Sequence, residues 1–362
     1  MRRTPALIVG GGPAGSAIAI RLARAGHAAL ILERHRETAD ALCGGFLSWR
    51  TLAALDSLGI APEQLNRHRV TRLRLCAGDR TAEAALPAPA LAVSRRRLDD
   101  LLLRTAETAG AAVERGVIVR EISGSSARMA DGGMVDGDAL FLASGKHDIR
   151  GTARPEEARG ADPTLGLRIR LPSAPALHTL LQGHIELHLF DRGYAGLVLQ
   201  EDGSANVCLA VHRSRLQAAG TPALLLAALG REAPQLGERL GYAAAMPAID
   251  AIANVPYGWR ARHGTPGLFR LGDQAGVIPS LAGEGMGIAL ASAAGAAQAY
   301  GAGGPRAATA WQQGFARALA RPMAIAGMVR SVAENPRSSP LLALARLPFL
   351  IQVIARATRI AH

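Results

Sequence analysis

The most constraining feature of this sequence is a glycine-rich turn close to its first residues. A short apolar run, 6–9, leads into the turn 10–15, and an amphipathic segment continues from there to Arg24. A continuous apolar run of this length is typical of a buried parallel strand. Gly26 ends the amphipathic segment, and residues 28–33 predict a second strand. The spacing therefore predicts a β-α-β unit that carries the G-x-G-x-x-G pattern in its first turn.

The residues of this turn have the chemistry of a dinucleotide site. Gly10 permits the tight turn, Gly12 lets a pyrophosphate approach the backbone, and Gly15 lets the helix pack closely on the sheet. The N–H groups and the dipole at the helix start favour phosphate. Glu33, at the end of the second strand, is expected to accept hydrogen bonds from both ribose hydroxyls. The predicted site comprises Gly10, Gly12, Pro13, Ala14, Gly15, Glu33 and Arg34.

A second glycine-rich segment lies far along the chain. A short apolar stretch ends in Gly272-Asp273, and after Pro279 the segment 283–287 opens an apolar helix. An aspartate at such a strand end can bind the hydroxyl of a sugar alcohol. A helix N-terminus can face the electron-rich edge of a ring. These residues predict that the dinucleotide site extends to this part of the chain.

With these two motifs in this order, the chain resembles the FAD-dependent oxidoreductases of the p-hydroxybenzoate hydroxylase and geranylgeranyl reductase superfamily. The resemblance implies that Asp273 holds the ribitol of FAD. It also implies that the ring of FAD lies against the start of the second glycine-rich helix. The residues concerned are Gly272, Asp273, Gly283, Gly285, Met286 and Gly287.

Two intermediate segments extend the resemblance. Cys43, Gly44 and Gly45 begin a stretch similar to the CGG-x-L-S segment of the reductase branch, which implies a place beside the flavin. Arg95 begins a stretch similar to R-x-x-L-D-x-x-L, whose arginine contacts FAD in relatives. The residues alone leave open a solvated basic turn for Arg95 and an inert buried thiol for Cys43.

The chain also departs from these relatives at two places. Where they carry A-D-G-x-x-S-x-V-R, this chain has a segment one residue shorter, 143–150, with Ser144 in place of the aspartate. Gly145 survives as an expected cofactor contact, and Lys146 is expected to add affinity for phosphate. Gly196 stands where geranylgeranyl reductases have the tryptophan of Y-x-W-x-F-P, which predicts a roomier substrate pocket. The first departure leaves the use of NAD(P)H open, and no W-x-W-x-I-P motif supports halogenation.

The predicted fold class is α/β, as an α+β composite. A Rossmann-like FAD-binding domain would carry an inserted antiparallel β-sheet substrate domain and C-terminal helices, because alternating runs at 184–190, 194–200 and 205–212 predict a β-meander. We assign 1–70, 96–160 and 245–330 to the FAD-binding domain, 71–95 and 161–244 to the substrate domain, and 331–362 to the C-terminal segment.

One polar trio lies within the predicted meander. His184, Glu186 and His188 alternate with apolar residues and so share one face of a strand. Such a trio can bind a metal. A polar face turned to solvent is the interpretation we favour, and no metal is predicted.

The C-terminal segment differs in character from the rest. Residues 322–334 predict a helix, residues 336–340 a break, and residues 341–360 a second helical stretch that Pro348 should kink or divide. The apolar stripe of this stretch includes Leu344, Leu347, Ile351 and Ile354. It is too short to span a membrane. It predicts either a helix that covers the core and closes the pocket or an interfacial membrane helix.

Charge and cysteine content limit the partners and the cellular compartment that the sequence predicts. The net charge is +12, but arginines are spread along the whole chain and Lys146 is the only lysine. With 4% aromatic residues this pattern argues against a nucleic-acid partner. Three cysteines cannot form a disulfide framework, which indicates a reducing compartment. We expect a cytoplasmic protein of bacterial biosynthesis, or one peripheral to the inner membrane face.

The function predicted from these features is that of an FAD-dependent oxidoreductase acting on a hydrophobic or aromatic small molecule. It would be a monooxygenase or a C=C reductase, with NAD(P)H as the donor. The alternatives are a flavin oxidase or dehydrogenase regenerated by oxygen, and a flavin-binding partner protein without turnover. No residue is placed by motif as a general acid or base, and the oligomeric state stays open.

Overall fold

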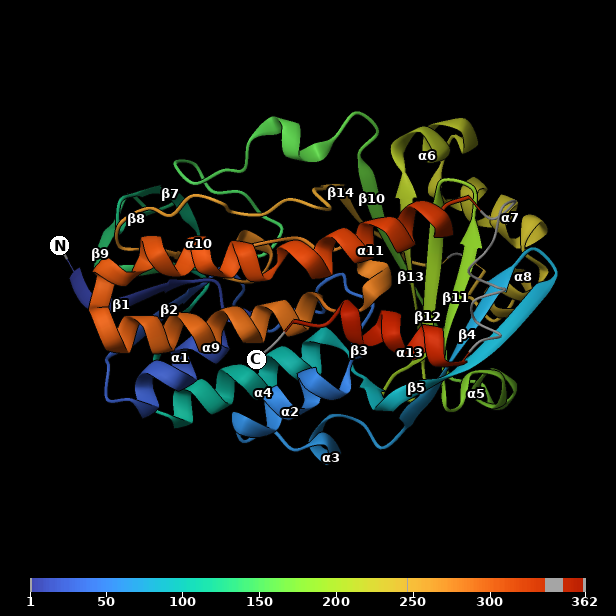
Figure 1. Cartoon of the computed structure of the whole chain (residues 1–362), viewed down its shortest axis with the longest axis horizontal. Helices are drawn as coiled ribbons and strands as arrows, with labels where there is room; N and C mark the ends of the chain where they lie inside the picture. Colours follow the sequence, from blue (N-terminus) through green and yellow to red (C-terminus); the bar gives the residue numbers. More distant parts are fainter. Residues whose placement is uncertain (1, 246, 336–347, 361–362) are drawn as a thin grey trace.

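The computed structural model describes residues 2–245, 247–335 and 348–360. Figure 1 shows two β-sheets side by side, with the helices of the C-terminal part lying across the front. The predicted α/β composite fold is confirmed.

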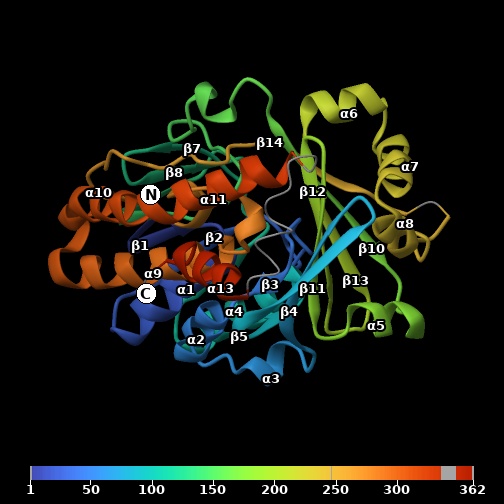
Figure 2. The ribbon, with the colours of Figure 1, turned by 45° about the vertical axis from the view of Figure 1, so that its right-hand side comes forward.

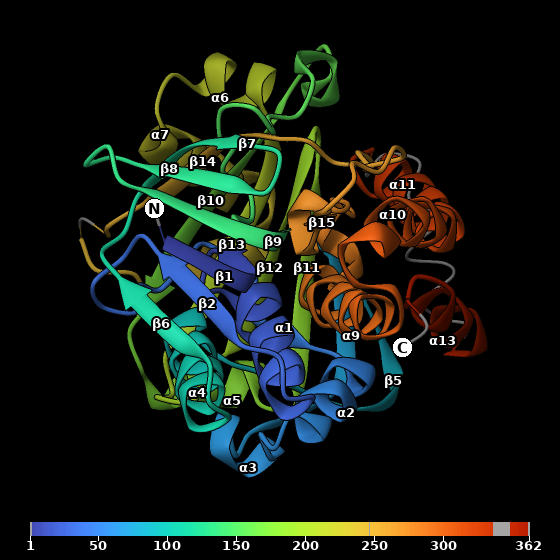
Figure 3. The ribbon, with the colours of Figure 1, turned by 90° about the vertical axis from the view of Figure 1, so that its left-hand side faces the viewer.

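The first sheet is built on the predicted β-α-β unit. Its strand order is β6-β2-β1-β9-β8-β7, and β15 also pairs with β9. The pairs among β6, β2, β1, β9 and β15 are parallel, whereas β7, β8 and β9 pair antiparallel. Figure 3 shows this sheet with its helices. The strands are β1 (Arg2–Val9), β2 (Ala29–Glu33), β6 (Ala112–Arg115), β7 (Val119–Ser123), β8 (Ser126–Met129), β9 (Met134–Leu142) and β15 (Leu268–Arg270).

Helices bury one face of this sheet. The apolar core between them includes Ile8, Ile18, Leu102, Phe141 and Leu290, all nearly inaccessible to solvent. Short apolar side chains such as those of α1 allow helix and sheet to approach closely. The helices of this part are α1 (Pro13–Arg24), α2 (Trp49–Ser57), α3 (Pro62–Leu65), α4 (Arg95–Thr108), α9 (Gly285–Gly303) and α10 (Ala308–Ala318).

The second sheet contains the predicted meander. Its order is β14-β10-β13-β12-β11-β4-β5-β3, and all pairs are antiparallel except the parallel pair β11 and β4. The strands are β3 (Phe46–Leu47), β4 (Arg69–Ala77), β5 (Arg80–Ala92), β10 (Thr164–Leu171), β11 (His184–Phe190), β12 (Gly193–Leu199), β13 (Ala205–His212) and β14 (Asp250–Val255). Figure 2 shows small helices on the side of this sheet away from the first one. They are α5 (Pro175–Leu181), α6 (Arg213–Ala219), α7 (Pro222–Glu232) and α8 (Pro234–Leu240). The domain limits given above remain a prediction.

The C-terminal helices lie against the second sheet and against helices that cover the first one. The predicted helix 322–334 is found as α11 (Ala320–Ala333), and α13 (Pro348–Ala357) follows beside it. Helix α13 is described from Pro348 onward, and the missing N–H of proline is harmless in the first turn of a helix. Whether Pro348 kinks or divides the stretch 341–360 stays a prediction, because residues 341–347 lie outside the described residues. The expected break at 336–340, and Leu344 and Leu347 of the expected stripe, lie outside the described residues. Within the described part, no helix is long and apolar enough to cross a membrane.

The prediction of a solvated face for His184, Glu186 and His188 is wrong. Glu186 and His188 are fully buried on the outer side of the second sheet, under the small helices. The Glu186 carboxylate pairs with Arg74 Nη1 at 2.5 Å and with Arg239 Nη2 at 3.0 Å, and His188 Nε2 lies 3.0 Å from it. Among the described residues no group of side chains has the make-up of a metal site. The trio therefore belongs to a buried ion-pair network.

We predict that Glu186→Ala destabilises the fold by about 3–5 kcal/mol, because it leaves two guanidinium groups without their buried counter-charge. Urea unfolding followed by circular dichroism would measure the change. Glu238→Ala is the matched control, since Glu238 also pairs with Arg239 but its side chain is 56% exposed. It should cost less than about 1 kcal/mol. Equal losses for the two variants would contradict a structural role of the buried pair.

The same carboxylate predicts an acid dependence of stability. Burial raises its pKa, but hydrogen bonds from His188 and Arg239 outweigh burial and lower the pKa of Glu186 to about 2. A carboxyl group with a depressed folded-state pKa stabilises the fold above its unfolded pKa, and this contribution is lost as pH falls toward the folded value. Between pH 4.5 and 2 the wild type should therefore lose this part of its stability, while Glu186→Ala should not.

Candidate functional site

A cavity of about 930 Å³ extends between the two sheets. It begins at the carboxyl ends of β1 and β9 and reaches the inner face of the second sheet and the C-terminal helices. Carboxyl ends of parallel strands are the usual place for ligands in such sheets. Of the cofactor residues predicted from sequence, all border this cavity except Gly15 and Gly287.

The glycine turn permits a close approach of backbone to backbone. Gly10 has φ +104°, and a β-carbon there would lie 2.5 Å from the carbonyl oxygen of Ala143. A β-carbon at Gly15 would collide with the carbonyl oxygen of Gly10. Helix α1 begins after Gly12 without a side-chain cap, so the N–H groups of its first turn have no acceptor within the helix. This helix start can therefore bind an anion.

Glu33 is held against this turn by two backbone hydrogen bonds. The N–H of Gly11 donates to its Oε2 at 2.7 Å, and the N–H of His35 donates to its Oε1 at 2.9 Å. Each carboxylate oxygen keeps a lone pair for a further donor such as a ribose hydroxyl. Arg34 follows at the rim of the cavity, with its Nε 2.8 Å from His35 Nε2.

Arg95 faces the same turn and is not a solvated basic residue. Its Nε and Nη2 donate to the two carboxylate oxygens of Asp99 at 2.9 and 2.7 Å, and its side chain is 17% exposed. Burial alone would lower its pKa, but the Asp99 carboxylate raises it, so the guanidinium stays charged. A β-carbon at Gly12 would lie 3.4 Å from Arg95 Nη2. Arg95 is thus placed to bind a phosphate at this turn.

Gly145, Lys146 and Asp273 meet at the middle of the cavity. Arg154 Nη2 and Gln274 Nε2 donate to the carbonyl oxygen of Gly145 at 2.5 and 2.9 Å, which fixes the loop after β9. Lys146 Nζ lies 3.0 Å from Asp273 Oδ2. Asp273 raises the pKa of Lys146 against burial. In turn burial raises the pKa of Asp273, but Lys146 outweighs it and leaves the pKa lowered.

Sequence reasoning named Lys146 and Asp273 but did not connect them. Their ion pair joins the loop after β9 to the one after β15, and no spacing in the sequence signals such a contact. Gly272, with φ +54°, donates its N–H to Ser292 Oγ at 2.9 Å and so fixes the backbone beside Asp273. The carboxylate proposed for the FAD ribitol therefore already has a counter-charge.

The start of α9 forms the far end of the predicted cofactor site. Gly283 has φ +63°, and a β-carbon there would lie 2.9 Å from the ring of Phe46. A β-carbon at Gly285 would meet nothing within 4 Å, so the backbone is open to the cavity there. Met286 also borders the cavity, whereas Gly287 packs against the carboxylate of Glu284.

Glu284 connects this helix start to the end of the described chain. Its carboxylate is fully buried and pairs with Arg359 Nη1 at 2.6 Å. Burial raises the pKa of Glu284, and the Arg359 charge opposes this rise without cancelling it. Arg359 Nη1 also donates to the carbonyl oxygen of Ala282 at 2.7 Å, and its guanidinium lies 5.2 Å from the centre of the Trp49 ring.

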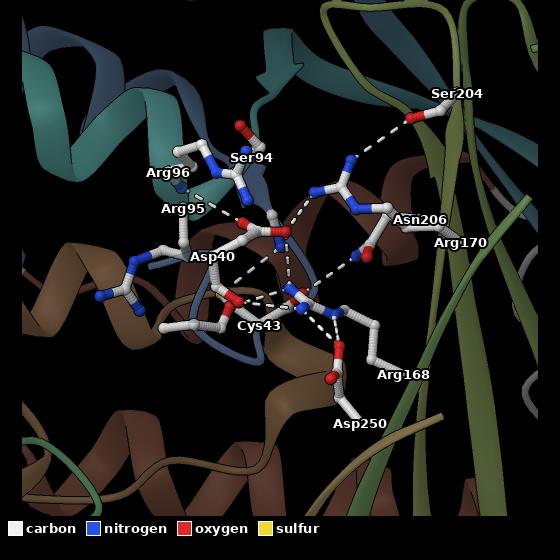
Figure 4. A network of polar contacts seen from close by, with 12 residues as sticks. Asp40, Cys43, Ser94, Arg95, Arg96, Arg168, Arg170, Ser204, Asn206 and Asp250 are labelled. Atoms are coloured by element: carbon white, nitrogen blue, oxygen red, sulfur yellow. Dashed lines mark hydrogen bonds and ion pairs between the residues drawn. The ribbon is translucent and has the colours of Figure 1, made fainter. Parts of the chain in front are cut away.

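Charged and polar side chains of the second sheet hold the loop that carries Cys43, Gly44 and Gly45 (Figure 4). Arg168 Nη1 lies 2.9 Å from Asp40 Oδ2, and Arg170 pairs with the same oxygen. Asn206 Nδ2 donates to the carbonyl oxygens of Cys43 and Gly44 at 3.0 and 3.1 Å. Burial would raise the pKa of Asp40, but the two arginines lower it. The second sheet therefore positions a loop that the resemblance assigns to the flavin.

Three hydroxyl groups lie among apolar side chains at the end of the cavity under the second sheet. Tyr194 Oη lies 2.6 Å from Ser280 Oγ, and Tyr257 Oη donates to the same Ser280 Oγ at 2.7 Å. Burial raises the pKa of both tyrosines, so both keep their protons. Sequence analysis gave no sign of this cluster, because three distant segments bring it together. The apolar lining includes Leu73, Leu75, Ile185, Leu187, Leu197, Val198, Leu209 and Val255.

Comparison with known proteins agrees with this geometry. Residues 3–149 match the family of FAD binding domains. A protein of Mycolicibacterium smegmatis named menaquinone reductase is 29% identical over 325 residues, which cover 83% of this chain and 77% of that protein.

Two solved structures share the fold over nearly the whole chain. A geranylgeranyl bacteriochlorophyll reductase-like protein of Thermoplasma acidophilum has a TM-score of 0.76 at 19% identity, covering 99% of this chain and 96% of that one. A flavin-dependent brominase has a TM-score of 0.77 at 16% identity, covering 98% and 93%. At such identities the likeness shows the fold alone.

The residues present fit FAD. Three glycines, Gly44, Gly145 and Gly285, border the cavity where a β-carbon would meet nothing within 4 Å, so a cofactor can lie directly on the backbone. The helix α1 start and the guanidinium of Arg95 supply donors for the phosphates. Glu33 and Asp273 supply acceptors for the ribose and ribitol hydroxyls. Bound there, FAD would bring the redox chemistry of its flavin ring.

We predict that Lys146→Met weakens FAD binding roughly tenfold, about 1.4 kcal/mol, because it leaves the Asp273 carboxylate without its counter-charge inside the cofactor cavity. Titration of the apoprotein, followed by quenching of FAD fluorescence, would measure this. Lys146→Arg keeps the charge and is the control. The double variant Lys146→Met/Asp273→Asn should recover most of the lost affinity, since it removes both charges. A double variant as weak as Lys146→Met would contradict the pairing role.

Proposed function

We propose that this chain, an FAD-dependent oxidoreductase of the p-hydroxybenzoate hydroxylase and geranylgeranyl reductase superfamily, reduces a carbon–carbon double bond in an apolar, lipid-like substrate. NAD(P)H is the proposed electron donor. The proposal rests on one observation. The cavity that the predicted cofactor residues border continues under the second sheet as an apolar chamber. The name of the mycolicibacterial relative, menaquinone reductase, supports a substrate of this class.

The chamber has the make-up of a site for a largely apolar molecule. Its wall is the inner face of the second sheet, on which Leu75, Ile185 and Leu187 lie. Apolar walls with a few placed polar groups are typical of small-molecule sites. Two charged side chains that this sheet contributes to the cavity, Arg168 and Asp250, pair with each other, and an apolar chain would gain by leaving water. These features favour a lipid-like substrate over a polar one.

The hydroxyl cluster supplies what the reduction needs from the protein. Adding hydrogen across a double bond requires a hydride, which the reduced cofactor provides, and a proton. Tyr257 Oη would give its proton to the substrate carbon, and Ser280 Oγ would then donate a hydrogen bond to the tyrosinate. Burial leaves the pKa of Tyr257 raised, but the hydrogen bond with Ser280 and the charge of Lys146 oppose part of this rise and so would stabilise that anion. We therefore propose Tyr257 as the proton donor.

An anaerobic experiment tests the proposal. The purified protein should be yellow, should bleach with NADPH, and should regain colour when a menaquinone in detergent is added without oxygen. After the quinone ring has been reoxidised in air, mass spectrometry should still find a product heavier by two hydrogen atoms, because a reduced ring alone would return to the starting mass. The control is the same mixture without protein.

Other outcomes would replace the proposal. Colour that returns only with oxygen, with a product heavier by one oxygen atom, would show a monooxygenase. Bleaching by the organic substrate itself, followed by reoxidation with oxygen, would show an oxidase. A protein that binds FAD and turns over nothing would be a flavin-binding partner protein.

Gly196 gives a further test of the chamber. It lies on the cavity wall, and a β-carbon there would come only within 3.6 Å of Leu187, an ordinary contact. We predict that Gly196→Trp raises the KM for a long isoprenoid substrate roughly tenfold or more, because the indole would occupy the chamber. Gly196→Ala, the control, should change KM little. An unchanged KM in Gly196→Trp, with an unchanged melting temperature, would place the substrate elsewhere.

A further inference from the structure

We propose that the outer faces of α11 and α13 dock this protein on an anionic membrane surface, and that the substrate enters the cavity between these two helices. The entry route rests on the proposed function, because only a lipid-like substrate would need it. The docking itself rests on the surface of the protein alone. Figure 3 shows α11 and α13 together on one side of the molecule.

Both helices have one face in the cavity and the opposite face in solvent. Ala326 and Val329 of α11, and Ile351, Ile354 and Ala355 of α13, border the cavity. Among the described residues, these two helices thus form part of the wall between the chamber and the outside. A lipid passing between them would exchange one apolar environment for another.

The outer faces of the same helices are apolar. Met328 is 63% exposed on α11, and Phe349 and Val353 on α13 are 72% and 41% exposed. In the part of the chain that the structure describes, six large hydrophobic side chains are this exposed, and these two helices carry three of them. Phe349 and Val353 are four residues apart and so lie on one face of α13. Exposed apolar side chains gathered in this way indicate an interaction surface.

Exposed basic side chains lie on the same two helices. Residues 308–362 contain seven arginines and one glutamate, a net charge of +6, which is half of the net charge of the whole chain. Arg321 of α11 and Arg356 of α13 are exposed, and within the described residues neither has an acidic partner. The single glutamate, Glu334, is paired with Arg330 and His212. Basic residues around an apolar face are the make-up of a site for anionic lipid.

The geometry favours a helix lying on the bilayer. Helix α13 has ten residues, far fewer than the number needed to span the apolar layer. Its C-terminal end is fixed by the buried Arg359–Glu284 pair and by Arg50 Nη1, which donates to the carbonyl oxygen of Ile360 at 3.0 Å. The outer face is thus held in place before any membrane arrives. A bilayer fits this surface better than a protein partner, because the charge and the apolar residues need no matching shape.

Vesicle sedimentation tests the docking. The holoprotein should pellet with vesicles of phosphatidylcholine and phosphatidylglycerol, and less with phosphatidylcholine alone or in high salt. The triple variant Met328→Ser/Phe349→Ser/Val353→Ser should bind the anionic vesicles at least tenfold more weakly. The matched control is Ile118→Ser/Met134→Ser/Leu224→Ser, which removes the other three exposed hydrophobic side chains. The control should bind as the wild type does.

Several results would overturn the docking proposal. Equal binding by the two triple variants would show that the surface of α11 and α13 is not the contact. A dimer that dissociates only in Met328→Ser/Phe349→Ser/Val353→Ser, without any vesicle binding, would show that a second copy covers this face. Failure of the wild type to bind either kind of vesicle would also overturn the docking proposal.

A second assay separates this proposal from the proposed reductase function. With substrate dissolved in detergent, the α11 and α13 variant should turn over at the wild-type rate, whereas with substrate in vesicles its rate should fall at least tenfold. An equal rate in vesicles would overturn the entry route. Vesicle binding without any turnover would instead contradict the reductase function and leave the docking intact.

Discussion

The packing of α1 against the carboxyl ends of β1 and β9 leaves no space for a β-carbon at Gly10 or Gly15. This contact fixes the start of α1, and with it the free N–H groups of the first turn, at one end of the cavity. Every other part of the predicted cofactor site is arranged relative to that point: Arg95 from α4, Glu33 from β2, and the loops after β9 and β15. A side chain at either glycine would move the phosphate end away from the rest.

The second sheet completes the site through charge. Asp40, paired with Arg168 and Arg170, ties the loop of Cys43 to strand β10, so the cavity has walls from both sheets. The buried charges of the site are paired before any ligand binds, as Arg95 with Asp99 and Lys146 with Asp273 show. Paired charges avoid the large cost of desolvating a single one. Each of these buried charges has a partner, so the cavity can be polar at one end and apolar at the other.

The sequence could predict the features that depend on interactions between residues close together in the chain. The β-α-β unit and the meander β11–β13 depend on neighbouring residues, and both are found close to their expected limits. The ion pair of Lys146 and Asp273, and the hydroxyl cluster of Tyr194, Tyr257 and Ser280, join segments far apart and leave no local pattern. Alternation along β11 also could not show that small helices cover the face of Glu186. The roles given to the cofactor residues remain predictions that agree with where the cavity lies.

One consequence of the Lys146–Asp273 pair concerns the handling of the protein. Because Lys146 is the only lysine in the chain, the only side-chain amine lies inside the cofactor cavity. Amine-directed labels and amine coupling to a solid support, which in most proteins modify many surface lysines at random, would here react at the N-terminal amine or at this one residue. Enzymatic acylation of lysine would have the same single target. Acylation of Lys146 would cancel the charge opposite Asp273, so lysine acylation of this protein would act at a single site in the cofactor cavity.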